Sequence, residues 1–103
     1  MKVRLSKLAL FKLSKLLEYL ETEWSAKTKK DFLNQLDHIF NLLSENPNMG
    51  PQSDIRPEIR KILLTKQCIA YYSIDGDIIH ILTIIDTRQD QNTINQEIDR
   101  HFG

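Results

Sequence analysis

The side chains most able to do chemistry are cationic and aromatic residues in the second half of the chain. Arg60 and Lys61 are neighbours in a predicted strand, and together with Arg56 and Lys66 they form a local basic group. Successive side chains of a strand point to opposite faces, so one of the two lies on the open face of a sheet. That cation either contacts an anionic partner or is a solvated edge charge.

Two tyrosines and a further arginine add to this group. Tyr71 and Tyr72 are consecutive in the next predicted strand and therefore face opposite sides of the sheet. Aromatic residues suit half-buried strand positions, so we assign Tyr72 to the core. Tyr71 faces the opposite side and is the better candidate for an exposed aromatic. Arg88 follows the last predicted strand, where it either contacts a partner or pairs with Asp86 or Asp90.

The remaining reactive side chains lack the spacing of a known site. His38, His80 and His101 have no cysteine or acid at metal-ligand spacing, and His80 is expected to pack within its strand. Cys68 lies inside a predicted strand and is interpreted as a buried core residue. No glycine-rich phosphate loop, metal motif or nucleophile elbow occurs. We therefore predict no cofactor and no metal.

Length and composition predict one soluble domain over residues 1–103. The chain is too short for two ordinary domains, and its 27% charged and 41% hydrophobic residues are typical of a globular protein, so we do not expect disorder. No apolar run reaches membrane-spanning length, and the single cysteine favours a cytoplasmic location. The zero net charge argues against gripping nucleic acid by bulk electrostatics, although residues 1–30 carry eight Lys or Arg against three acids.

The first half of the sequence predicts a short strand and two helices. Val3 and Leu5 alternate with polar residues, which is typical of a strand with one buried face. Ser6 and Ser25 precede helical apolar spacing and are predicted to cap helices that end near residues 21–24 and at Asn46-Pro47. We interpret Trp24, between the helices, as a staple of the helical hairpin or alternatively as a partner contact.

The second half predicts a loop and three antiparallel strands. Residues 46–58 contain all three prolines and form the loop, and the strands follow at 58–65, 67–75 and 77–86. Asp75-Gly76 supplies a tight hairpin turn. His80 is expected on the same face as Leu82 and Ile84. Helical spacing returns in the tail 91–102 through Ile94, Ile98 and Phe102. The fold class is α+β, with one sheet face covered by helices and the other partly open.

The ordered set of elements resembles a known family. The first helix carries Ala9, Leu13, Leu16 and Tyr19; the second carries Phe32, Leu36, Ile39 and Leu43; then come Pro47-Asn48-Met49-Gly50, the strand aromatic Tyr72 and the closing Asp86-Thr87-Arg88. This pattern is similar to that of the RelE/ParE toxins of bacterial type II toxin–antitoxin pairs. The resemblance implies a β-α-α-β-β-β fold and a cognate antitoxin.

The resemblance also implies one of two activities. RelE-like members cut messenger RNA on the ribosome, and ParE-like members bind DNA gyrase. A RelE-like site would use Arg60, Lys61, Arg88 and an aromatic such as Tyr71 to move a proton and stabilise the charge that builds on phosphorus. Ile62 and Ile69 stand where such nucleases often carry cations, and losing one of these cations typically costs about a hundredfold or more in rate.

We therefore expect a ParE-like toxin that inhibits growth by binding a cellular target, with the helical hairpin and its basic N-terminal face engaging that target. The antitoxin is expected to lay an amphipathic segment across apolar surface that the helices leave uncovered. A ribosome-dependent endonuclease acting on messenger RNA is the first alternative. A homologue that still binds an antitoxin but has lost toxicity is the second.

Overall fold

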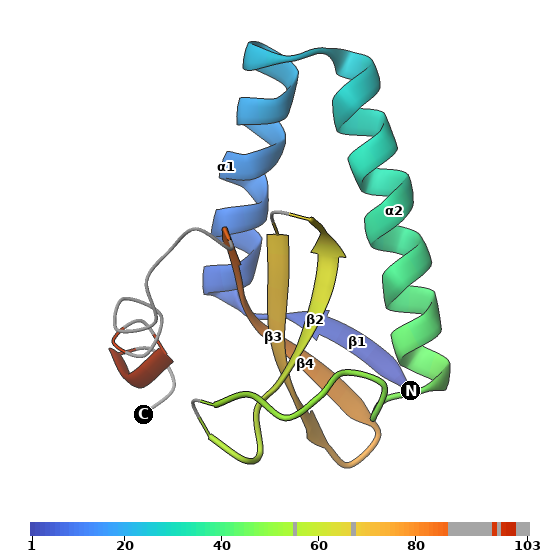
Figure 1. Cartoon of the computed structure of the whole chain (residues 1–103), viewed down its shortest axis with the longest axis vertical. Coiled ribbons are helices and arrows are strands. Elements are labelled where there is room, and N and C mark those ends of the chain that lie inside the picture. Colours follow the sequence, from blue (N-terminus) through green and yellow to red (C-terminus); the bar gives the residue numbers. More distant parts are fainter. Residues whose placement is uncertain (55, 67, 87–95, 97, 101–103) are drawn as a thin grey trace.

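The computed structural model describes residues 1–54, 56–66, 68–86, 96 and 98–100. Within them the chain forms an α+β fold in which two helices pack on one face of a four-stranded sheet (Figure 1). This confirms the predicted fold class. The elements are β1 (Lys2–Leu5), α1 (Lys7–Glu23), α2 (Ala26–Glu45), β2 (Arg60–Thr65), β3 (Cys68–Asp75) and β4 (Ile78–Asp86).

Serine caps set where both helices begin, as the sequence predicted. Ser6 Oγ accepts a hydrogen bond from the Ala9 amide at 3.0 Å, and Ser25 Oγ accepts one from the Thr28 amide at the same distance. Each cap satisfies an amide that has no partner within the helix. Ser6 also bonds to the sheet: its amide donates a hydrogen bond to Ile81 O at 2.9 Å, and its hydroxyl donates one to Leu82 O at 2.7 Å. The start of α1 is thereby fixed to the middle of β4.

The sheet has the order β1-β4-β3-β2, with β1 parallel to β4 and the other pairs antiparallel. Gly76 turns between β3 and β4 with φ of +61°, a conformation that suits glycine. A β-bulge interrupts the β3–β4 pairing, because Tyr71 pairs with Thr83 whereas Tyr72 pairs with Ile81. Leu82 is therefore an extra residue in β4.

The bulge corrects one prediction about side-chain direction. Leu82 packs on the sheet face away from the helices, whereas Ile84 packs in the core beneath them. His80 lies between Ile79 and Ile81, which both face the helices, so it shares a face with Leu82 but not with Ile84. A period of two read from sequence fails wherever an extra residue enters a strand.

The main core lies between the helices and the sheet. Its buried members include Leu36 and Leu43 of α2, Tyr72 and Ala70 of β3, and Ile81 of β4. A second, smaller cluster covers the opposite face, and there Ile98 of the tail is fully buried. Residues 96 and 98–100 are helical, whereas Ile94 and Phe102 of the predicted tail helix lie outside the described residues.

The buried hydroxyl of Tyr72 holds the loop that follows α2. It accepts a hydrogen bond from the Gly50 amide at 3.0 Å and donates one to Pro47 O at 2.8 Å. The approach is so close that a Cβ on Gly50 would lie 2.5 Å from Lys61 O and 2.8 Å from the tyrosine oxygen. Only glycine fits there, and the predicted core position of Tyr72 is confirmed.

Tyr72→Phe is expected to lower the free energy of unfolding by about 1–3 kcal/mol, because it leaves the buried Gly50 amide without its acceptor. Urea denaturation would measure the change. Tyr19→Phe is the matched control, since Tyr19 is 54% exposed and should lose less than about 0.5 kcal/mol. Equal effects in the two variants would contradict the assigned role of the Tyr72 hydroxyl.

Candidate functional site

Strand register separates the predicted cationic residues. Arg60 pairs with Tyr72 and Lys61 pairs with Tyr71, and the two tyrosines belong to clusters on opposite sheet faces. Arg60 therefore lies on the helix side and Lys61 on the other side, as alternation predicts. Arg88 and His101 lie outside the described residues. The two described cations thus do not converge on one site.

The Arg60 side chain holds the loop that follows α2. Its Nη1 donates hydrogen bonds to Gly50 O at 2.7 Å and to Asn48 O at 3.3 Å. The guanidinium thus holds the same loop that the Tyr72 hydroxyl holds. The sequence pattern did not predict this role of Arg60, because the two carbonyls that it binds belong to residues 10 and 12 positions earlier in the chain.

Tyr71 is buried, and the expectation that it is exposed is wrong. It is 3% exposed and packs in the second cluster with Ile98, Leu82 and Ile85. Burial, and secondarily the nearby charge of Asp54, raise the pKa of Tyr71 above its ordinary value of 10.0. Because the raised pKa keeps the phenol protonated near neutral pH, little phenolate is present there to accept a proton. The prediction that Tyr71 and Tyr72 face opposite sides of the sheet is nevertheless confirmed.

The aliphatic residues at the expected cation positions are part of the packing. Ile62 is buried in the main core, and Ile69 packs against the second cluster on the opposite face. Cys68 is also buried, and desolvation followed by the charge of Asp86 raises its pKa to about 11. Its thiol therefore stays protonated at neutral pH, which makes it unsuited to nucleophilic attack.

A groove lies between the helical hairpin and the ends of the strands. In Figure 1 the hairpin extends well past the strand ends that lie between its two helices. The groove has a volume of about 980 Å³. It is lined mainly by apolar and aromatic side chains: Phe11, Leu16, Tyr19, Leu20 and Trp24 of α1 and its end, Phe32 of α2, and Cys68, Ile84 and Ile85 of the sheet.

Three aromatic residues of this groove are open to solvent. Phe11 is 59% exposed, Tyr19 54% and Trp24 68%. The interpretation of Trp24 as a staple of the hairpin is therefore wrong, because a staple would be buried between the helices. Large contiguous apolar surface on a small protein marks an interaction site. The alternative interpretation of Trp24, as a partner contact, agrees with this exposure.

A second hollow on the hairpin is polar. It is lined by Ser14, Leu17, Glu18, Glu21, Thr22 and Lys29. An ion pair between Lys29 Nζ and Glu21 Oε2, at 2.6 Å, joins the two helices there. This hollow lacks the aromatic lining of the groove, so we take the groove as the candidate binding site.

The described part of the chain contains neither a metal-binding cluster nor a membrane-spanning helix. Its His, Cys, Asp and Glu side chains include no group of three or more placed to hold a metal ion. None of the helices in the described residues combines the length and apolar character needed to span a bilayer.

Comparisons with known proteins give a family and a fold. The family model for the ParE toxin of the type II toxin–antitoxin system parDE matches residues 3–91. A solved structure described as the chromosomal ParDE TA system from P. aeruginosa matches with a TM-score of 0.69 at 18% sequence identity. The match covers 84% of this chain and 95% of the other. No curated protein matches the chain.

Arg60→Ala is expected to lower the free energy of unfolding by about 1.5–3 kcal/mol, because it removes two hydrogen bonds from a charged donor to the loop. Lys61→Ala, the adjacent control, should change it by less than about 0.5 kcal/mol. Thermal unfolding followed by circular dichroism would measure both. An unaltered melting temperature for Arg60→Ala would contradict the structural role.

Proposed function

The chain belongs to the ParE toxin family of type II toxin–antitoxin systems, and we propose that it arrests growth by binding a cellular target. The proposed target is DNA gyrase, and a cognate antitoxin holds the toxin inactive. The antitoxin docks an amphipathic segment in the groove between the helical hairpin and the strand ends. The protein acts by binding rather than by cutting RNA.

The observation that carries the proposal is the solvent-exposed aromatic lining of the groove. Phe11, Tyr19 and Trp24 each leave more than half of their surface in water. Covering such side chains releases roughly 25 cal/mol for each Å² of apolar surface removed from water. Amphipathic helices dock in grooves of this kind through apolar side chains spaced three or four residues apart.

Binding is favoured over cleavage by the surroundings of the predicted catalytic residues. Tyr71 is buried with a raised pKa, Arg60 is bonded to loop carbonyls, and Ile69 offers no charge. Cleavage of RNA needs a proton acceptor and preorganised cations around the phosphate. Among the predicted catalytic cations in the described residues, only Lys61 has a side chain without a hydrogen bond or ion pair to another described residue. One such cation is a weak basis for catalysis.

Phe11→Ser is expected to weaken binding of the antitoxin encoded beside this chain about tenfold, because an exposed aromatic anchor of the groove is lost. Calorimetric titration of the purified proteins would measure the dissociation constant. Leu10→Ser is the matched control, since Leu10 is the preceding residue of α1, is 53% exposed, and is absent from the groove lining.

The control variant should bind within about twofold of the unchanged chain, because it alters no groove contact. Both variants should keep the stability of the unchanged chain, since both side chains are already largely solvated. If Leu10→Ser weakened binding as much as Phe11→Ser, the antitoxin would be docking elsewhere on α1.

Inducing the chain alone in bacteria is expected to stop growth while messenger RNA stays intact. Mapping of RNA 5′ ends shortly after induction should show no new ends within translated codons, and purified gyrase should lose supercoiling activity when the chain is added. New ends inside codons would instead establish the ribosome-dependent nuclease. Growth without arrest would leave an antitoxin-binding homologue that is not toxic.

A further inference from the structure

We infer that the two rims of the groove differ in charge and that this difference selects its partner: an amphipathic helix with acidic residues along the side that faces α1. The inference rests on the proposed function, since it names the chemistry of the segment that occupies the groove. It assigns a specificity determinant, Lys15, to the α1 side of the groove.

The charges of α1 are divided between two sides of the helix. Lys12 and Lys15 line the groove, whereas Glu18 and Glu21 line the polar hollow on the hairpin. Lys15 Nζ lies 5.6 Å from the centroid of the Phe11 ring, so the ammonium group is held over an aromatic of the groove. Asp86 of β4 also lines the groove, so the net positive charge that the α1 rim presents to a bound helix is that of Lys15.

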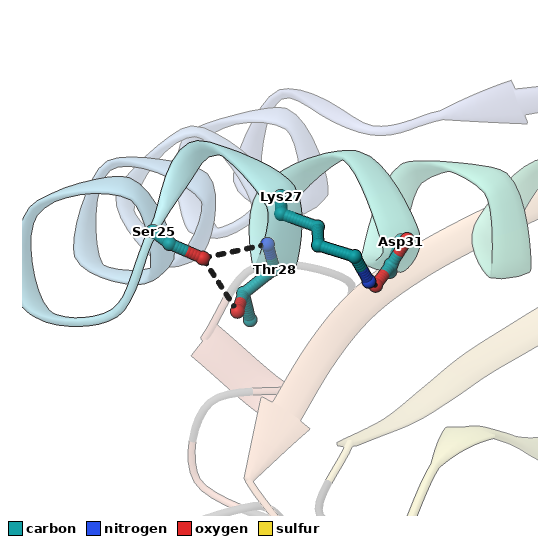
Figure 2. Close-up of polar contacts among 4 residues, drawn as sticks. All are labelled: Ser25, Lys27, Thr28 and Asp31. Atoms are coloured by element: carbon teal, nitrogen blue, oxygen red, sulfur yellow. Dashed lines mark hydrogen bonds and ion pairs between the residues drawn. The ribbon is translucent and has the colours of Figure 1, made fainter.

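The α2 rim carries a different charge. Thr28, Asp31 and Gln35 line it. Asp31 Oδ2 lies 2.9 Å from Lys27 Nζ, with both side chains more than half exposed, and Figure 2 shows this pair beside the Ser25 cap. A solvated pair of this kind leaves little net charge on the rim. Across the groove a basic rim thus faces a nearly neutral one.

This asymmetry fits one kind of occupant. An amphipathic helix that buries its apolar stripe on Leu16, Leu20 and Phe32 must present one flank to α1 and the other to α2. Acidic residues on the α1 flank would lie near the Lys15 ammonium, while basic residues there would meet a like charge. Complementary rim charges of this kind raise association rates and exclude wrong partners.

The test uses the full chain and the antitoxin encoded beside it. Lys15→Glu is expected to weaken binding about tenfold at low ionic strength, because an attraction becomes a repulsion. The loss should shrink at 1 M salt, where the screening length falls to about 3 Å. Lys15→Arg should bind within about twofold of the unchanged chain. Calorimetry gives the affinities, and emission from Trp24, the only tryptophan and a groove residue, reports occupancy of the groove.

Lys7→Glu is the matched control. It makes the same change of charge on the same helix, at an exposed position that does not line the groove. It should bind within about twofold of the unchanged chain. An equal loss in Lys7→Glu and Lys15→Glu would show only general attraction and would overturn the inference. So would full binding by Lys15→Glu.

The two proposals fail in different ways. If the unchanged chain binds the antitoxin and the Trp24 emission shifts, but Lys15→Glu binds equally well, only the charge selection is wrong. If the antitoxin does not bind, or binds without a shift of the Trp24 emission, the groove is not the docking site. Both the proposed docking and the inference drawn from it would then be overturned.

Discussion

The junction of β1 and α1 through a single residue is the constraint on which the rest of the structure depends. Ser6 ties the start of α1 to Ile81 and Leu82, in the middle of β4. From there β4 has four residues left, about 13 Å of strand. The 17 residues of α1 rise about 26 Å in the same direction. Roughly half of α1 therefore projects past the sheet, and α2 returns alongside it.

That projection explains why apolar residues of α1 stay in water. The sheet covers the helices only near their sheet-proximal ends, where Ala9 and Leu43 are fully buried. Beyond the strand ends, the side chains that would continue the core have no sheet beneath them and line the groove instead. The exposure of Tyr19 and Trp24 is thus a geometric consequence of a short junction and a long hairpin. A partner that supplies the missing layer would complete the core.

Local signals made most of the fold predictable, and long-range contacts account for what was missed. Ser6, Ser25 and Asp75-Gly76 act within a few residues, so the sequence alone located the helix starts and the hairpin turn. The burial of Tyr71 depends on Ile98, and the task of Arg60 depends on a loop ten residues earlier. The direction of Ile84 depends on a bulge that only strand pairing creates. None of these appears in a local pattern.

The different roles of Arg60 and Lys15 follow from where each lies in the fold. Arg60 and Tyr72 together hold the loop after α2 against β2 and β3, so the guanidinium of Arg60 is already engaged in the fold. Lys15 lies near the level of the strand ends, where its ammonium group stays near the groove without supporting the core. Changing a cation that stabilises the fold lowers stability, whereas changing a solvent-exposed cation on the groove rim leaves stability nearly unaltered. Partner specificity can therefore be tuned at Lys15 while the fold stays constant.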